Sequence, residues 1–287
     1  MSRQSGLVQV FAGAVLISFA AVFVKLVHVG PVAAGFYRMT VGATGLAVLV
    51  AWQRLPLRVG RRAMGYAVAG GFLFAADLLF WHQSIFDVGP GLSTILANFQ
   101  VFLLAAYGMV VLKERMGWRL AVAVPLALVG LFLLVGADWG NLPGDYRRGV
   151  LLGLGTAVAY GSYLLVLRAS QARAERLNPV VNLMIICVVA AAVLAVWAAA
   201  AHQSLVIPDA GSLGLLVAYG ITAQVLGWLL ISHGLPRTPA SRAGLVLLCQ
   251  PGLTFVWDVL FFARPTGARD VIGVVLALGA IYMGTRR

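Results

Sequence analysis

Charge is what this sequence has least of. Charged residues make up 10% of the chain, whereas a soluble domain carries about 25%. Hydrophobic residues account for 61%, and they fall in continuous runs long enough for helices of about 20 residues to cross a bilayer. The composition therefore excludes an ordinary soluble domain. It predicts an all-α integral membrane protein whose surroundings are the lipid bilayer.

The sequence also lacks the residue patterns of most catalytic and cofactor sites. Its two cysteines, Cys187 and Cys249, lie inside apolar segments and predict small buried side chains rather than a disulfide. No His-x-x-x-His or Cys-x-x-Cys spacing suggests a metal, and no glycine-rich phosphate motif precedes a helix. We find no set of nucleophile, base and acid. We therefore expect a protein that is not an enzyme, needs no cofactor and does not use ATP directly.

The excess of positive charge is explained by its positions. Lys and Arg number 21 against 9 Asp and Glu, which in a soluble protein would suggest nucleic acid. Here they fall mostly in loops on the side of the N-terminus, so no nucleic-acid partner is expected. Only four arginines lie in loops on the other side: Arg147, Arg148, Arg264 and Arg269. The positive-inside rule then predicts a multi-pass membrane protein with both termini cytoplasmic.

Apolar segments and short connections predict ten membrane spans. Their expected ranges are 7–28, 32–53, 64–86, 92–112, 120–137, 149–167, 180–201, 213–233, 243–262 and 270–285. Small residues recur every fourth position at Gly149, Gly153, Ala157 and Gly161, which predicts a helix face that neighbouring backbones approach closely.

An internal repeat divides the chain into two halves. The sequence GWRLAVAVPLAL at 117–128 matches GARDVIGVVLAL at 267–278 in six of twelve positions, so we expect one unit over 1–140 and a second over 141–287. Five spans per half is an odd number, and the second half must therefore enter the membrane from the opposite side. Inverted repeats of this kind place a substrate site near the midplane, between the halves.

These features resemble the drug/metabolite transporter (DMT) superfamily, EamA type. The resemblance rests on the ten spans, the two inverted five-helix halves, the short loop at Asp87–Gly91 and Glu114 at the end of the fourth span. Two positions depart from the family pattern: Arg264 stands at the match to Glu114, and of the paired prolines only Pro251 is kept. The resemblance implies an exporter of small amino acids and related metabolites in the bacterial plasma (inner) membrane.

Polar and aromatic residues inside the predicted spans form the candidate site. They recur on single helix faces, and facing lipid would leave their polar atoms without partners. The candidates for lining a substrate cavity are Asp77, Trp81, His82, Asn98, Gln100, Tyr160, Gln224, Trp228, Gln250, Thr254 and Trp257. For each amide, histidine and carboxylate, interhelical hydrogen bonding is the alternative interpretation.

Three charged residues within or near the spans are candidates for gating or ion pairing: Lys25, Arg38 and Asp258. Arg38 could pair with Asp258 or extend its side chain outward to the membrane surface. Four other tryptophans, Trp52, Trp118, Trp139 and Trp197, lie at span ends, where aromatic residues anchor helices to the membrane interface.

The predicted function is a secondary transporter that exports small amino acids and related metabolites by alternating access. In this hypothesis Asp77 accepts a hydrogen bond from the substrate ammonium, while amides, Tyr160 and indole N–H groups bind its carboxylate. Protons that titrate Asp77 or Asp258 could drive transport, and facilitated diffusion fits equally well. A broad drug or metabolite exporter and a nucleotide-sugar-type antiporter are the alternatives. A channel or an intramembrane enzyme ranks below them.

Overall fold

The computed structural model describes residues 3–111, 113, 117–136, 139–171, 177–234 and 246–285. Every regular element within these residues is a helix, as the composition predicts. Glu114, which the sequence places at the end of the fourth span, lies outside the described residues.

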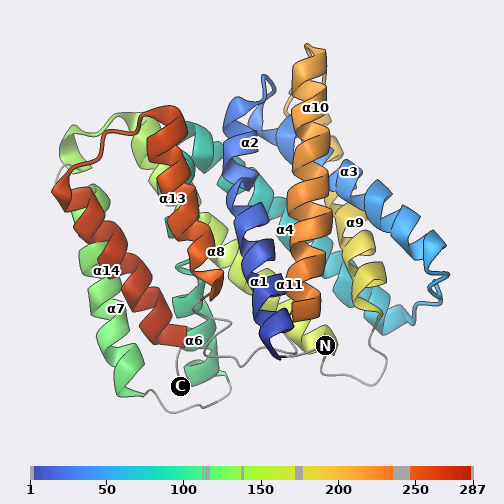
Figure 1. The fold of residues 1–287 in the computed structure, drawn as a ribbon, viewed down its shortest axis with the longest axis horizontal. Helices are drawn as coiled ribbons and strands as arrows, with labels where there is room; N and C mark the ends of the chain where they lie inside the picture. Colours follow the sequence, from blue (N-terminus) through green and yellow to red (C-terminus); the bar gives the residue numbers. More distant parts are fainter. Residues whose placement is uncertain are drawn as a thin grey trace.

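Helices follow one another with few residues between them (Figure 1). The α-helices are α1 (Arg3–Ser18), α2 (Ala20–Leu26), α3 (Pro31–Trp52), α4 (Arg61–Val88), α5 (Pro90–Ala97), α6 (Gln100–Val110), α7 (Trp118–Leu131), α8 (Gly144–Gln171), α9 (Pro179–Ala200), α10 (Ala210–Tyr219), α11 (Trp228–Gly234), α13 (Cys249–Phe262) and α14 (Ala268–Thr285). Two π-helical segments, η1 (Phe132–Gly136) and η3 (Gly220–Gly227), and the 3₁₀ turn η2 (Trp139–Asn141) complete the set.

Seven of the resulting spans are long and apolar enough to cross a membrane: Gly6–Leu26, Pro31–Trp52, Arg61–Val88, Pro90–Val110, Gly144–Leu167, Pro179–Ala200 and Ala210–Ile231. Each lies within a few residues of a predicted span. The shorter apolar helix Trp118–Leu134 occupies the predicted range 120–137. Helices α13 and α14 lie in the last two predicted ranges and are not among the seven.

Three of the spans are interrupted at mid-length. The first breaks at Phe19 between α1 and α2, and the fourth breaks at Asn98 and Phe99 between α5 and α6. The span Ala210–Ile231 widens into the π-helix η3 between α10 and α11. Interrupted helices free backbone groups, and at membrane depth they are tolerated where protein or a cavity surrounds them. These breaks therefore point to the interior of the bundle.

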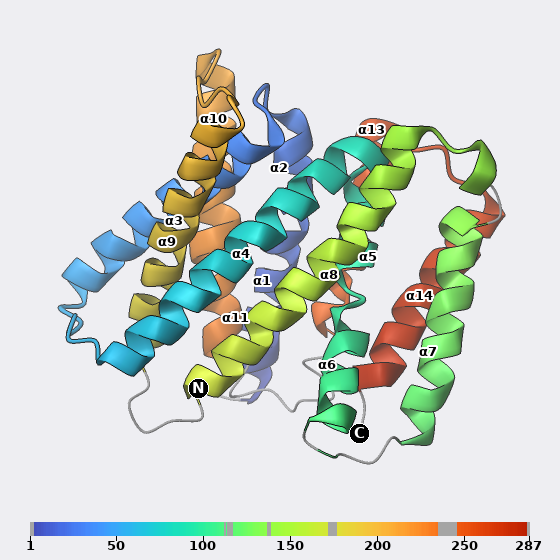
Figure 2. The same cartoon turned by 180° about the vertical axis from the view of Figure 1, so that it is seen from behind.

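Two long tilted helices, α4 and α8, cross the middle of the molecule side by side (Figure 2). Helices α3 and α9 pack together at one edge, and α7 and α14 form a pair at the other (Figures 1 and 2). The start of α1 and the end of α14 lie at the same end of the bundle (Figure 1).

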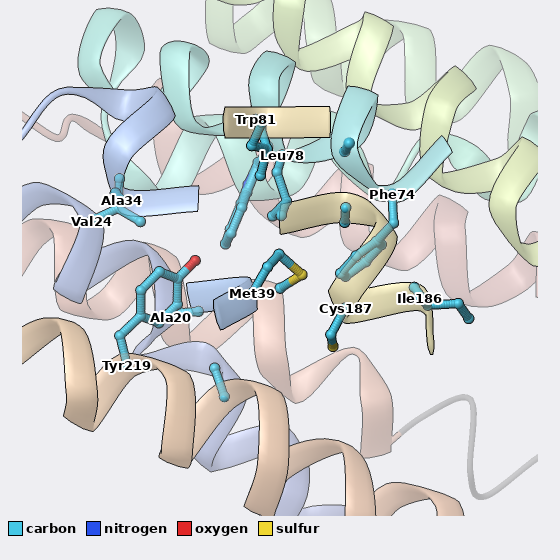
Figure 3. Packing of buried hydrophobic residues seen from close by; sticks show 14 of the residues in the cluster. Ala20, Val24, Ala34, Met39, Phe74, Leu78, Trp81, Ile186, Cys187 and Tyr219 are labelled. Carbon is cyan, nitrogen blue, oxygen red and sulfur yellow. The ribbon is translucent and has the colours of Figure 1, made fainter. Parts of the chain in front are cut away.

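The larger apolar core joins α3, α4 and α9, and its buried members include Met39, Phe74, Leu78, Trp81, Cys187 and Tyr219 (Figure 3). The predicted small-residue face of α8 is confirmed at Gly149, Gly153 and Gly161. A Cβ atom on each of these would come within 2.4–2.7 Å of side chains of α4, α5 or α6. Both cysteines are free: Cys187 is buried and Cys249 is half-buried.

The tryptophans fall into the two predicted groups. Those at span ends are exposed: Trp52 by 79%, Trp118 by 70%, Trp139 by 37% and Trp197 by 52%. Trp81 is 7% exposed, and Trp228 and Trp257 are half-buried. The inner group is therefore available to shape the interior.

Candidate functional site

A cavity of about 280 Å³ lies among the interrupted helices. Its walls come from both halves of the chain and include polar, aromatic and aliphatic side chains. The lining residues are Ile17, Arg38, Phe74, Asp77, Trp81, Thr94, Ala97, Asn98, Gln100, Thr156, Tyr160, Leu164, Trp228, Ile231, Leu247 and Gln250. Seven of the eleven predicted cavity residues are in this set: Asp77, Trp81, Asn98, Gln100, Tyr160, Trp228 and Gln250.

Asp77 gives the cavity its carboxyl group. It lies on α4, three residues after Phe74 and four before Trp81, and this spacing places all three on one helix face. The residue is 7% exposed, and its carboxyl oxygens form no hydrogen bond or ion pair with any described residue. A buried carboxyl group without partners is costly, so its acceptor atoms are available to a ligand in the cavity.

Arg38 on α3 gives the cavity its guanidinium group. The residue is 4% exposed. Its Nε donates to Gln224 Oε1 at 3.0 Å, and its Nη1 donates to the Tyr219 hydroxyl oxygen at 3.0 Å. The guanidinium carbon also lies 5.7 Å from the ring centre of Phe74 and 5.9 Å from that of Trp81. These contacts hold the cation among aromatic rings and neutral acceptors.

Three further polar atoms of cavity residues are buried and have no partner in the described part of the chain. They are the indole Nε1 atoms of Trp81 and Trp228 and the Oε1 atom of Gln100. Trp81 belongs to the first half and Trp228 to the second. Two donors and one acceptor without protein partners are what a polar ligand would satisfy.

The other four predicted cavity residues do not line the cavity, because protein groups already occupy their polar atoms. Gln224 is fully buried; its Oε1 accepts from Arg38 and its Nε2 donates to Cys187 Sγ at 3.4 Å. His82 is also fully buried, and lies between the Tyr219 hydroxyl and the Pro31 carbonyl. Gln224 therefore holds Arg38 directly, and His82 holds it through the Tyr219 hydroxyl.

Thr254 and Trp257 hold α13 against the break between α1 and α2. The Thr254 hydroxyl donates to the Ser18 carbonyl at 3.0 Å, and the Trp257 indole donates to the Ser18 hydroxyl at 2.9 Å. The Trp257 ring stacks on Phe19 with ring centres 4.8 Å apart. Their donor groups are used in helix packing, and this explains why they lie away from the cavity.

The predicted pair of Arg38 with Asp258 is wrong. Asp258 Oδ2 accepts from the Gly91 amide at 2.9 Å and lies 3.3 Å from Nη1 of Arg264. The same Arg264 nitrogen donates to the Val88 carbonyl at 2.9 Å. Arg38 also does not extend outward, because its hydrogen bonds hold it in the interior.

Lys25 lies apart from these groups, with its ammonium 5.7 Å from the ring centre of Phe86. It does not line the cavity. The structure thus separates the three charged candidates: Arg38 belongs to the cavity, Asp258 to a contact between α5 and α13, and Lys25 to neither.

The contact around Asp258 joins α5 to α13. Gly89 has a φ of 88°, and the turn that it makes between α4 and α5 directs the Gly91 amide at Asp258. Gly91 also packs on Phe255 of α13, where an added Cβ would lie 2.9 Å from the Phe255 Cα. Helices α5 and α13, one from each half of the chain, therefore pack tightly at this contact.

Sequence reasoning missed two residue classes at the site. Tyr219 is fully buried and bonds both Arg38 and His82, but it stands among apolar residues and no motif marks it. The aliphatic wall, made by Ile17, Leu164, Ile231 and Leu247, cannot be distinguished in the sequence from lipid-facing positions. Among the described residues, no group of three His, Cys, Asp or Glu side chains could hold a metal.

A bundle of apolar helices around a partly polar cavity is the architecture of a multi-pass membrane transporter. Residues 4–136 and 147–286 each match the EamA-like transporter family. The chain belongs to this family, within the drug/metabolite transporter superfamily, which confirms the resemblance seen in the sequence.

Individual relatives are similar along most of their length. The uncharacterized transporter YwfM of Bacillus subtilis (strain 168) is 24% identical, covering 86% of this chain and 82% of its own. The uncharacterized inner membrane transporter YhbE of Escherichia coli (strain K12) is 27% identical over 86% of this chain and 78% of its own. A protein of known crystal structure shares the fold, with a TM-score of 0.68, 19% identity and coverage of 99% and 98% of the two chains.

Proposed function

We propose that the protein exports small amino acids and related metabolites across a bacterial inner membrane by alternating access. The observation that carries this proposal is the cavity, which holds one carboxyl group and one guanidinium group that do not pair with each other. Asp77 and the Nη2 atom of Arg38 have no hydrogen-bond partner among the described residues. A zwitterion offers its ammonium group to Asp77 and its carboxylate to Arg38.

Alternating access requires two halves that can move against each other, and the helix contacts support an inverted repeat of five spans each. Helix α4 of the first half packs on α8 of the second. In the repeat, α11 and η3 match α4, and α1 matches α8; these elements also pack on each other. The pairs α3 with α9, α5 with α13 and α7 with α14 each join matching spans of the two halves. Contacts thus recur when the halves at 1–140 and 141–287 are exchanged, with the cavity between them.

The proposed orientation puts both termini in the cytoplasm. Helix α1 begins and α14 ends at one end of the bundle (Figure 1), and the Asp258 contact lies toward the other. In this orientation the tight contact of α5 with α13 closes the periplasmic side. Release of substrate would then require that contact to open.

A broad metabolite exporter is the second candidate, favoured by the aliphatic and aromatic part of the cavity wall. Ile17, Phe74, Leu164, Ile231 and Leu247 give an apolar surface that many side chains could contact. A nucleotide-sugar substrate is less well matched, because Arg38 is the one cation among the described residues that line the cavity. We propose transport rather than catalysis, since the described lining residues include no set of nucleophile, base and acid.

Counterflow in liposomes tests the proposal. Purified protein is reconstituted with an unlabelled amino acid inside, and uptake of labelled amino acids is measured for a panel of side chains. Saturable uptake that depends on the internal amino acid is the expected result. An added pH gradient tests whether protons are coupled to transport. Uptake that rises linearly with concentration and shows no counterflow would indicate a channel. Counterflow that is stimulated by internal drugs and by no amino acid would favour the broad exporter.

The variant Asp77→Asn tests the role assigned to the carboxyl group. Asn keeps the size and one acceptor oxygen but removes the charge that a substrate ammonium needs. Transport should fall at least about tenfold, since a hydrogen bond to a charged group contributes about 1.5–3 kcal/mol. Asp145→Asn, on an exposed carboxylate at the start of α8, is the matched control. Unchanged transport by Asp77→Asn at normal expression would refute the assignment.

A further inference from the structure

We propose that Arg38 is the anchor for the substrate carboxylate, and that Tyr219, Gln224 and His82 are positioning residues that hold it. The inference rests on the proposed function in one respect, since it names the part of an amino acid that Arg38 binds. It assigns to Arg38 a binding role in place of the gating role that its position in the sequence suggests.

The first observation is that Arg38 is buried without an anion. It is 4% exposed, and its two named partners are an amide oxygen and a hydroxyl oxygen. Arginine stays protonated in proteins, and a buried charge that is not paired is costly. No ion pair joins Arg38 to Asp77 or to any other described carboxylate. A ligand anion would supply the missing charge.

The second observation is the geometry of the free donors. Nε and Nη1 of Arg38 are used by Gln224 and Tyr219, which leaves Nη2 without a partner among the described residues. The side chain lines the cavity. The guanidinium carbon of Arg38 lies 5.9 Å from the centre of the Trp81 ring. The indole N–H groups of Trp81 and Trp228 are buried and have no partner among the described residues. A carboxylate has two oxygens that accept from such donors.

The third observation is a directional chain of hydrogen bonds behind Arg38. The Pro31 carbonyl can only accept, so His82 Nδ1 carries the proton and donates to it at 3.0 Å. His82 Nε2 then accepts from the Tyr219 hydroxyl at 2.9 Å. The Tyr219 oxygen is thereby left to accept from Arg38 Nη1. Each group has one role, and the chain fixes the guanidinium without neutralising it.

The support comes from the other half of the molecule. Arg38 lies on α3, while Tyr219 ends α10 and Gln224 lies on η3. Gln224 is itself held, because its Nε2 donates to Cys187 Sγ on α9. Oriented donors of this kind reduce the entropic cost of binding. The site is therefore built to receive an anion in one place.

Matched ligand pairs test the anchor. Purified protein is titrated with alanine and with alaninamide, which keeps the ammonium and lacks the carboxylate, and thermal stabilisation gives an apparent Kd for each. Because charge-assisted bonds are the strong ones, the wild-type protein should bind the acid about 10- to 100-fold more tightly than the amide. Equal binding of the two ligands by the wild-type protein would overturn the proposal.

Variants test whether the preference for the acid over the amide comes from Arg38. Arg38→Gln should bind acid and amide alike, and Arg38→Lys should keep part of the preference. Lys25→Gln removes a cation outside the cavity and should keep the wild-type ratio. Tyr219→Phe, which removes one hydroxyl from a packed ring, should reduce the ratio about three- to tenfold. A wild-type ratio in both Arg38→Gln and Tyr219→Phe would overturn the proposal, and a changed ratio in Lys25→Gln would also count against it.

A second ligand pair separates this inference from the proposed function. If no amino acid is carried in counterflow, the proposed function fails. Propionate and propionamide, which lack the ammonium, then test the anchor alone by the same stabilisation measurement. Carboxylate-selective stabilisation that is lost in Arg38→Gln supports the anchor. Stabilisation by neither member of either pair overturns it.

Discussion

The close contact of α4 with α9 is the feature whose disruption can be predicted most sharply. A Cβ atom placed on Gly71 would lie 2.5 Å from the Val189 Cβ, 2.6 Å from its Cγ1 and 3.2 Å from the Ile186 carbonyl oxygen. Carbon atoms in contact lie about 3.5–4.0 Å apart. Gly71→Ala therefore requires the two helices to separate by about 1 Å, and α4 carries Asp77 and Trp81.

The expected change in stability follows from two opposing effects. Overpacking a tight contact costs about 1–3 kcal/mol, while replacing Gly by Ala inside a helix returns about 0.5–1 kcal/mol. Gly71→Ala should thus lower the free energy of unfolding by about 0.5–2 kcal/mol. Gly65→Ala lies on the same helix, has no atom within 4 Å of its added Cβ, and should be neutral or stabilising.

Unfolding of the purified protein in detergent, by heat or denaturant, measures both variants. A double-mutant cycle with Val189→Ala identifies the contact, since removing the valine methyl groups makes room for the new Cβ. The coupling between the two changes should be at least about 0.5 kcal/mol, as expected for residues in contact. Equal stability of Gly71→Ala and Gly65→Ala, with no coupling to Val189→Ala, would refute the packing described here.

Three further predictions concern other parts of the molecule. Asp258→Asn leaves Arg264 buried without its carboxylate and should lower the free energy of unfolding by about 1–3 kcal/mol, measured by denaturation, whereas Asp145→Asn on an exposed pair should change it little. Trp228→Phe removes an indole N–H that has no partner among the described residues. The free energy of unfolding should therefore change by less than about 1 kcal/mol, while the affinity for ligand falls. Hydrogen bonds at the start of α10 lower the pKa of Asp209 below its ordinary 3.8. Its stabilising effect should be complete above that pH and lost as the pH falls through the lowered pKa, and in Asp209→Ala this pH dependence should be absent.

The spans were predictable because the bilayer imposes a constraint that acts within each segment. Backbone groups inside a membrane must bond within their own helix, so length and hydropathy alone locate the ends. The range predicted as 32–53 is observed as Pro31–Trp52, and 180–201 as Pro179–Ala200. The interface tryptophans follow from the same constraint. Breaks inside spans, such as those at Phe19 and Asn98, were not predicted, because neither glycine nor proline stands at either break to mark it.

The charged partners were not predictable, because they depend on contacts between distant parts of the chain. Arg38 is separated by 181 residues from Tyr219 and by 186 from Gln224. Asp258, which the sequence offered as a partner for Arg38, instead bonds Gly91, 167 residues away. Positions along a membrane normal can be deduced from span boundaries, and they made Arg38 and Asp258 plausible partners. Which helices touch at that depth cannot be deduced in this way.

The same limitation explains why eleven similar polar and aromatic residues divide into two groups. Helical spacing shows that a residue faces the interior, but it does not show whether another helix offers that residue a partner. Gln224 and Gln100 are both amides in spans, yet Gln224 has both ends bonded, while the Gln100 oxygen is buried and has no partner among the described residues. The proposed substrate site therefore rests on the unsatisfied atoms rather than on the polar residues as such.

Arg38 connects the site to the movement of the two halves. Its guanidinium belongs to α3, but its acceptors belong to α10 and η3 of the other half. Any motion that separates α3 from η3 must lengthen or break those bonds, and a buried cation that loses its acceptors is strongly destabilised. A bound carboxylate would compensate for that loss. Under the proposed function, occupancy by a carboxylate substrate and the relative position of the two halves are energetically linked through Arg38.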